Sequence, residues 1–106
     1  MRTYELRTYT LSTREAFDRY RTVHYPRHLT SFALHGVGLH GLWAAADGSL
    51  VLHALISYTE GLDPKKFAEQ FMLSDEFRAD MDGFDSSAIV GVTTTLLEPS
   101  AGSPLL

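Results

Sequence analysis

The chain has 106 residues, a formal net charge of −4 and no cysteine, and 44% of its residues are hydrophobic. This size and balance fit one globular domain and leave no room for a second core. The acidity argues against a nucleic-acid partner, because phosphate binding relies on clustered basic charge. Without cysteine there is neither a disulfide framework nor thiolate chemistry. No apolar run approaches the roughly eighteen residues of a membrane span. The N-terminus also lacks the features of a signal peptide, so we expect a cytoplasmic protein without a membrane partner.

The first predicted strand covers residues 4–11, which are rich in Tyr and Thr. Two sets of side chains alternate along it: Tyr4, Leu6 and Thr8 on one face, and Glu5, Arg7 and Tyr9 on the other. The second set combines charge with an aromatic ring. It indicates a face that is half-buried or that meets another chain.

A helix is predicted to begin after Ser12 or Thr13, either of which can cap it. One stripe of this helix carries Phe17, Tyr20, His24, His28 and His35. Pro26 lacks an N–H and its ring clashes with the carbonyl one turn earlier. We therefore expect a kink or break near Tyr25, followed by a second helical piece that ends at Gly36 in a left-handed cap.

Residues 37–45 and 50–58 predict two strands joined at Asp47-Gly48. An Asp-Gly pair between apolar runs is typical of a two-residue type I′ hairpin turn, because both turn positions need positive φ.

This turn fixes a register in which cross-strand partners sum to 95, so that His40 pairs with Leu55 and His53 with Leu42. The two histidines then share one face of the sheet. The opposite face is predicted to be core and carries Val37, Leu39, Trp43, Leu50, Leu52, Ala54 and Ile56. A slip of one residue would invert this assignment.

Asp63-Pro64 predicts the start of another helix, which Ser74 restarts, and residues 89–97 predict the last strand. The order strand–helix–strand–strand–helix–strand is that of a ferredoxin-like α+β domain with a four-stranded antiparallel sheet. We assign residues 1–99 to this single domain and residues 100–106 to a tail. The sheet face without helices is predicted to carry Tyr9, His40, Leu42, His53 and Leu55. That face is too apolar to remain exposed to solvent, so a second copy of the chain is expected to cover it.

Five short motifs occur along residues 3–99. They are Tyr4-Glu5-Leu6-Arg7-Thr8-Tyr9, His24-x-Pro26, His35-Gly36 before a strand with Trp43, Leu73-Ser74-Asp75-Glu76-Phe77, and Leu97-Glu98-Pro99. In this order they resemble the NIPSNAP family. Two departures are Phe77, where the family usually has Trp, and Ser74-Asp75, where it has Asp-Pro. The resemblance implies the dimeric α+β barrel superfamily, in which two ferredoxin-like sheets close on each other. That superfamily includes cofactor-free monooxygenases, haem-degrading enzymes and polyketide cyclases. NIPSNAP-like proteins share no single set of catalytic residues, so the resemblance assigns no catalytic residue to this chain.

A pocket between the first helix and the sheet is the sharpest functional hypothesis. Its expected walls are Phe17, Tyr20, Tyr25, Phe32, Phe67, Phe71 and Trp43, which suit a small apolar or aromatic ligand. Within it we take His24 and His28 as candidate proton-transfer residues, because His titrates near neutrality. His24 is favoured, since the carbonyl freed by Pro26 could fix its surroundings. The alternative is that these aromatics simply make the core.

Metal binding by His24 and His28, spaced i and i+4, is disfavoured because Pro26 lies between them and no third ligand is evident. Nucleophile and nucleotide-binding motifs are also absent, so we expect no metal, haem or other cofactor. Two functions follow from these observations. The first is a cofactor-independent enzyme, a monooxygenase or a cyclase/isomerase, acting on an aromatic or polyketide-like molecule by His-assisted proton transfer. The second is a non-catalytic homodimeric module that binds a small ligand or another protein.

Overall fold

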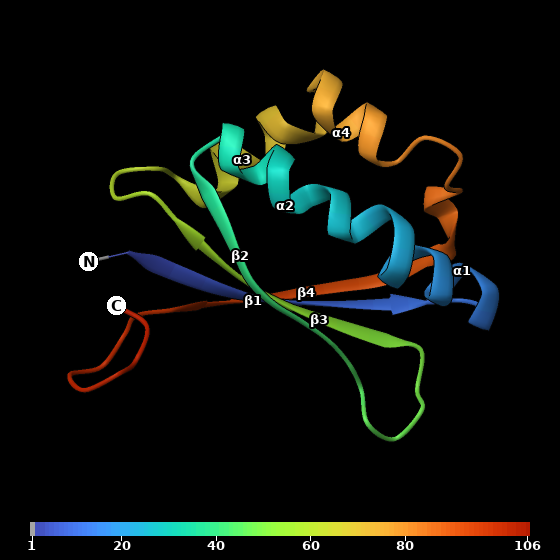
Figure 1. Ribbon diagram of the computed structural model, residues 1–106, viewed down its shortest axis with the longest axis horizontal. Helices are drawn as coiled ribbons and strands as arrows, with labels where there is room; N and C mark the ends of the chain where they lie inside the picture. The colour runs from blue at the N-terminus through green and yellow to red at the C-terminus, as the bar shows by residue number, and fades with distance from the viewer. Residues whose placement is uncertain (1) are drawn as a thin grey trace.

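The computed structural model describes residues 2–106 as two layers, a sheet and a set of helices that covers one of its faces (Figure 1). Along the chain the elements are β1 (Thr3–Leu11), α1 (Arg14–Arg19), the π-helical turn η1 (Tyr20–His24), α2 (Tyr25–Leu34), β2 (Val37–Ala44), β3 (Val51–Tyr58), α3 (Pro64–Met72), α4 (Asp75–Asp80), the 3₁₀ turn η2 (Ser86–Ala88) and β4 (Ile89–Leu97). The strands lie in the order β2-β3-β1-β4, and every neighbouring pair is antiparallel. The predicted ferredoxin-like α+β fold is confirmed.

The first helical segment does not break at Pro26. Residues 19, 20, 24 and 25, which bound its three pieces, all keep right-handed helical φ and ψ, and α1, η1 and α2 follow without a gap. The irregularity takes the form of one wide turn, in which the Tyr25 N–H donates to the Tyr20 carbonyl five residues earlier. Pro26 has no N–H to donate to a carbonyl one turn earlier, and the π turn accommodates this missing hydrogen bond without ending the helix. The expected break near Tyr25 is therefore replaced by η1.

The predicted caps of the helices are present. Thr13 accepts from the Ala16 N–H at the start of α1, and Asp63 and Ser74 accept from backbone N–H groups at the starts of α3 and α4. Gly36 has φ of 79°, the left-handed value expected for the residue that ends α2.

The β2–β3 hairpin differs from the prediction. Among residues 2–106 only glycines have positive φ, so Asp47-Gly48 is not a type I′ turn. The Ala45 N–H donates to the Val51 carbonyl at 3.1 Å, and the connection is longer than two residues.

The longer connection shifts the register by one residue near the loop, where His53 pairs with Trp43 and not with Leu42. The assignment of Trp43 to the core was wrong, because it shares the helix-free face with His53 and is 53% exposed. Its ring lies over Gly41, where any Cβ would sit 2.0 Å from the indole. A bulge between Leu39 and Gly41 then restores the predicted register, and Leu39 pairs with Ile56.

The core lies between the helices and the inner face of the sheet. Its buried β3 side chains are Leu52, Ala54, Ile56 and Tyr58. The pairings of β1 place Glu5, Arg7 and Tyr9 on this same inner face, so this set is turned inward. Tyr9 and Leu42 were predicted on the helix-free face and lie instead on the inner one, because they pair with the inward-facing Leu52 and Ala54. No helix within residues 2–106 is long and apolar enough to cross a membrane.

Candidate active site

A cavity of about 310 Å³ lies between the helices and the inner face of the sheet. Its apolar walls include Phe32, Ile56, Phe67, Ala68, Phe71, Met72, Phe77, Met81, Ile89 and Val92, and its polar lining groups are Arg7, Tyr9, Tyr20, His28 and Ser86. Met72 and Val92 are 64% and 47% exposed, so the cavity opens between α3 and β4. Apolar walls with a few convergent polar groups are typical of small-molecule sites. We call this space the central cavity.

A second hollow of about 330 Å³ lies between α1 and η2 and is lined mainly by small and polar residues such as Ser12, Arg19 and Asp85. It is a shallow surface feature, and its polar lining offers little apolar area to a ligand. The central cavity is the better candidate for a small-molecule site.

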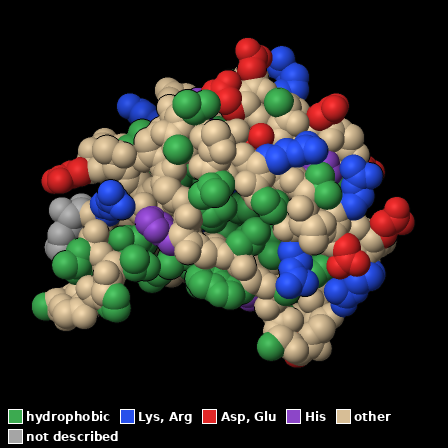
Figure 2. All heavy atoms as spheres, viewed as in Figure 1, with side chains coloured by type: hydrophobic (Ala, Val, Ile, Leu, Met, Phe, Trp, Pro, Cys, Tyr) green, Lys and Arg blue, Asp and Glu red, His purple; other side chains and the backbone are tan. Residues whose placement is uncertain are grey.

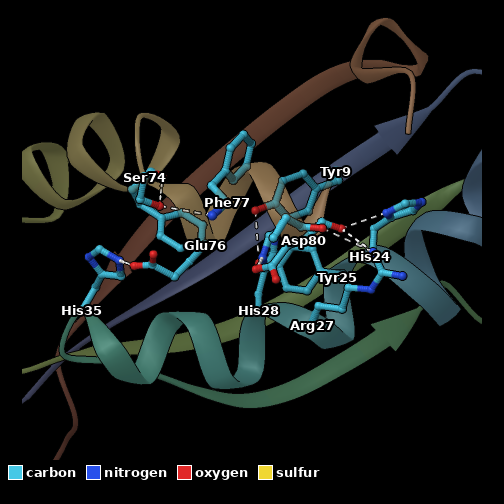
Figure 3. A network of polar contacts seen from close by, with 12 residues as sticks. Tyr9, His24, Tyr25, Arg27, His28, His35, Ser74, Glu76, Phe77 and Asp80 are labelled. Carbon is cyan, nitrogen blue, oxygen red and sulfur yellow. Dashed lines mark hydrogen bonds and ion pairs between the residues drawn. The ribbon is translucent and has the colours of Figure 1, made fainter. Parts of the chain in front are cut away.

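His28, on α2, contributes the imidazole that faces the central cavity and contacts Asp80. Its Nδ1 lies 2.8 Å from the Asp80 carboxylate at the end of α4 (Figure 3). Its ring is stacked between Phe32 and Phe77, with centroids 4.9 and 6.0 Å away. The carboxylate and the two rings fix the orientation of the imidazole.

The tautomer of His28 follows from these contacts. An ionised Asp80 can only accept, so Nδ1 carries the proton and Nε2 keeps its lone pair. Every fully buried side-chain polar atom in residues 2–106 has a partner, yet Nε2 makes no hydrogen bond there. This nitrogen therefore keeps contact with the cavity space. Burial lowers the pKa of His28, against the opposing effect of Asp80, so the imidazole is neutral at pH 7.

The lowered pKa of His28 gives a testable dependence of stability on pH. Between the folded-state pKa and about 6.5, the unfolded chain binds more protons than the folded one. The free energy of unfolding should be level above about pH 7 and should fall below about pH 6.5, by at most ~1.4 kcal/mol per pH unit for one histidine. His40, whose pKa is lowered by burial and by Arg2, contributes with the same sign.

Urea unfolding between pH 5 and 8 measures this dependence. His28→Gln should remove its share of the slope, and His40→Gln should reduce the slope further. A stability that rises on acidification in the wild type would contradict the assignment of a neutral, buried His28.

Arg7 reaches the same cavity from β1. Its Nε donates to the Tyr9 hydroxyl at 2.7 Å and its Nη1 to the Glu5 carboxylate at 2.8 Å. Glu5 also accepts from the buried Tyr58 hydroxyl at 2.8 Å. Burial alone lowers the pKa of Arg7, but Tyr9 and Glu5 outweigh this and raise it, so the guanidinium is a permanent cation.

His24 has a different environment from His28, although both are almost fully buried. Its Nδ1 lies 2.9 Å from the backbone carbonyl of Asp80, and its Nε2 lies 3.3 Å from the Arg19 guanidinium. Since a carbonyl accepts and a guanidinium donates, the ring is the Nδ1–H tautomer with both nitrogens engaged. It packs on Phe84 and is not part of the cavity lining. Figure 3 shows His24 and His28 meeting Asp80 through its backbone and its carboxylate, respectively.

The other residues expected from the sequence divide into three groups. Tyr20, Phe32, Phe67 and Phe71 line the central cavity. Phe17 and Tyr25 are buried in the core outside its lining, although the Tyr25 hydroxyl contacts that of Tyr9 at 3.1 Å. Trp43 lies on the far face of the sheet. Within residues 2–106 no three His, Asp or Glu side chains are grouped to hold a metal ion.

The sequence reasoning missed Arg7, Tyr9 and Asp80 as site residues. The alternation of β1 already placed Arg7 and Tyr9 on one face, and the inward position of that face was the missing information. Asp80 lies in a run of acids on a short helix, and only its approach to α2 distinguishes it from its neighbours.

No family model and no curated protein sequence matches the chain. Solved structures do match. A NIPSNAP family protein of unknown function from Agrobacterium tumefaciens shares 19% identity over 99% of this chain and 94% of its own, with a TM-score of 0.76. A NIPSNAP domain protein from Burkholderia xenovorans shares 16% identity over 96% and 98%, with a TM-score of 0.71. A Nitrosomonas europaea protein, provisionally described as an antibiotic biosynthesis monooxygenase, shares 10% identity over 95% and 93%, with a TM-score of 0.62. The resemblance noted in the sequence motifs thus extends to three dimensions, and the chain has the ferredoxin-like α+β fold of NIPSNAP family proteins.

Proposed function

We propose that the protein is a NIPSNAP-like, cofactor-independent enzyme that transfers a proton to and from a small aromatic or polyketide-like molecule. The observation that carries this proposal is the Asp80–His28 pair, whose unpartnered Nε2 meets an aromatic-walled cavity. A neutral imidazole held in one tautomer by a carboxylate is a suitable general base at neutral pH. The Nitrosomonas europaea protein, provisionally described as a monooxygenase, has the same fold at 10% identity and supports the proposal to that extent.

The proton transfer itself uses only groups of this chain and the ligand. His28 Nε2 takes a proton from an acidic carbon or hydroxyl of the ligand, and the electron pair stays on the ligand as an enolate or phenolate. Asp80 stabilises the imidazolium that forms. The enolate can then attack an internal carbonyl in cyclisation, or regain the proton elsewhere in isomerisation. With dioxygen as co-substrate, a CH₂ group can become a carbonyl, while the second oxygen atom leaves as water.

The size of the cavity limits the ligand. Its volume of about 310 Å³ is near the lower end of the range for small-molecule sites, roughly 300–1,000 Å³. We therefore infer a ligand of one or two fused rings, with any longer part extending past Met72 and Val92 to the surface.

Deuterium exchange at the acidic CH₂ of 2-tetralone, followed by NMR in heavy water, tests proton transfer without knowledge of the natural substrate. The wild-type protein should accelerate this exchange beyond buffer of the same pH, with a rate that falls when His28 is protonated. Binding of 2-tetralone without faster exchange would favour the second function, a non-catalytic ligand-binding module. Absence of binding would remove the central cavity as a ligand site.

We also propose that the protein is a homodimer closed by the helix-free faces of two sheets. That face carries Leu6, His53, Leu55 and the half-exposed Trp43 and Leu97. Figure 2 has the view of Figure 1, with the helices above the sheet, and shows hydrophobic side chains across the middle of the molecule and charged side chains mainly over the helices and the periphery. A second copy would bury the exposed rings and aliphatic groups of this face.

Sedimentation at micromolar concentration should give about twice the mass of one chain. Leu55→Glu, which places a charge at the centre of the helix-free face, should give monomers. The matched control is Leu34→Glu, on the outer side of α2 where Leu34 is 70% exposed, and it should leave the mass unchanged. A monomeric wild-type protein would contradict the proposed dimer.

A further inference from the structure

The Arg7 guanidinium keeps unused hydrogen-bond donors beside the central cavity. Nε and Nη1 donate to Tyr9 and Glu5, and the guanidinium also interacts with the Tyr58 hydroxyl, whereas no hydrogen bond of Nη2 is present within residues 2–106. Arg7 lines the cavity, and its side chain keeps 21% of its surface accessible. No fully buried side-chain nitrogen or oxygen of the described chain lacks a partner, so Nη2 belongs to the accessible part of the side chain.

Tyr9 supplies a second donor in the same place. Its hydroxyl oxygen accepts from Arg7 Nε and lies 3.1 Å from the hydroxyl of Tyr25. Tyr25 has no exposed surface, and Tyr9 is the only hydrogen-bond partner of its hydroxyl in residues 2–106. A buried hydroxyl proton without an acceptor is costly, so Tyr25 donates to Tyr9. The Tyr9 oxygen then accepts twice, and its own proton can donate to a ligand in the cavity or to the neighbouring Tyr20 hydroxyl, which lines the same cavity.

We propose that Arg7 and Tyr9 form an oxyanion site in the central cavity, and that the ligand is a neutral phenol or enol that ionises when it binds. This inference rests on the proposed function, because the ligand's proton goes to His28. Donors fixed in advance around a developing negative charge, in a site with little water, stabilise that charge strongly. The ligand oxygen accepts from Arg7 Nη2 and from the Tyr9 hydroxyl.

The charges around the cavity favour a neutral acid over a permanent anion. Glu5 already balances Arg7, and the Asp80 carboxylate faces a neutral His28, with the exposed Arg27 guanidinium 3.1 Å from the Asp80 backbone carbonyl. Tyr20 and Tyr25 add none, because burial raises the pKa of each well above its ordinary value. A carboxylate ligand would bring a further negative charge into a largely buried site, where Arg7 is already paired with Glu5. A phenol that gives its proton to His28 leaves the total charge unchanged and creates an imidazolium–Asp80 pair.

Two probes of similar shape separate binding from ionisation. 4-Nitrophenol absorbs differently as phenol and phenolate, so its absorbance reports its protonation state in the cavity, whereas 4-nitrotoluene cannot ionise. The wild-type protein should lower the pKa of bound 4-nitrophenol relative to the free probe. Arg7→Gln should raise this bound pKa, with a loss of about tenfold or more in affinity for the phenolate. The affinity for 4-nitrotoluene should change less than twofold, and Arg14→Gln on exposed α1 should change neither.

Arg7→Gln leaves Glu5 without its cationic partner and can impair folding. The double variant Glu5→Gln/Arg7→Gln removes both charges, and Tyr9→Phe removes only one donor. The pKa of bound 4-nitrophenol is therefore measured with these two variants as well, and circular dichroism checks that each is folded. A bound 4-nitrophenol that stays neutral, an Arg7→Gln protein that ionises it equally well, or tighter binding of 4-nitrobenzoate would each overturn the oxyanion site while leaving the cavity as a ligand site. Failure of both neutral probes to bind would overturn the proposed function as well.

Discussion

Replacing His28 with Gln should lower the rate of protein-catalysed exchange of 2-tetralone by roughly 10²–10⁴-fold. Gln keeps a side chain that can hydrogen-bond to Asp80, but it has no nitrogen that gains and loses a proton near pH 7. The affinity for 2-tetralone should change little, because the walls of the cavity are mostly carbon. NMR exchange rates and a binding titration on the same samples separate the two quantities.

The matched control is His53→Gln. His53 is a histidine of β3 on the helix-free face, hydrogen-bonded to Thr8 at 3.0 Å, and it does not line the central cavity. This variant should keep the full exchange rate. If His53→Gln abolished exchange and His28→Gln did not, the reaction would take place on the helix-free side of the sheet, which the proposed dimer encloses.

Replacing His24 with Ala should cost about 2–4 kcal/mol of unfolding free energy and leave the exchange rate of the folded protein nearly intact. The imidazole is fully buried, so its removal leaves a cavity. It also removes the donor that ties η1 to the end of α4. Urea unfolding measures the first effect, and NMR exchange at a temperature where the variant is folded measures the second.

Val23→Ala is the control, because Val23 lies in the same π turn but is 37% exposed. Its loss of stability should be well below that of His24→Ala. A His24→Ala protein with wild-type stability and no exchange activity would mean that His24, and not His28, is the base.

The element order and the helix caps could be predicted because each depends on a few neighbouring residues. Asp63, Ser74 and Gly36 act within one turn of their own helices, and most residues of β4 are β-branched. The register of β2 on β3 could not be predicted in the same way. It depends on the conformation of a loop and on a bulge at His40, and no local pattern distinguished these from a two-residue turn.

The choice between the two histidines of α2 and η1 also lay beyond the sequence. His24 and His28 differ by their partners, and the decisive partner is Asp80, which is 52 residues or more away in the chain. One histidine meets the backbone of Asp80 and the other its side chain. The alternation along β1 placed Arg7 and Tyr9 on the same face of the sheet. It could not show whether the helices cover that face, because alternation in a strand does not distinguish the two faces.

The π turn at residues 20–24 has a geometric consequence for the inner surface of the helix. In a regular α-helix, two consecutive residues point about 100° apart, so their side chains reach different neighbours. Here His24 and Tyr25 are both fully buried. The extra residue of the turn shifts the phase of α2 relative to α1, so that His24 reaches α4 while Tyr25 reaches Tyr9 on the sheet. Loss of one residue from this turn would rotate α1 out of phase with α2, and a single helix could no longer hold α4 and the sheet at once.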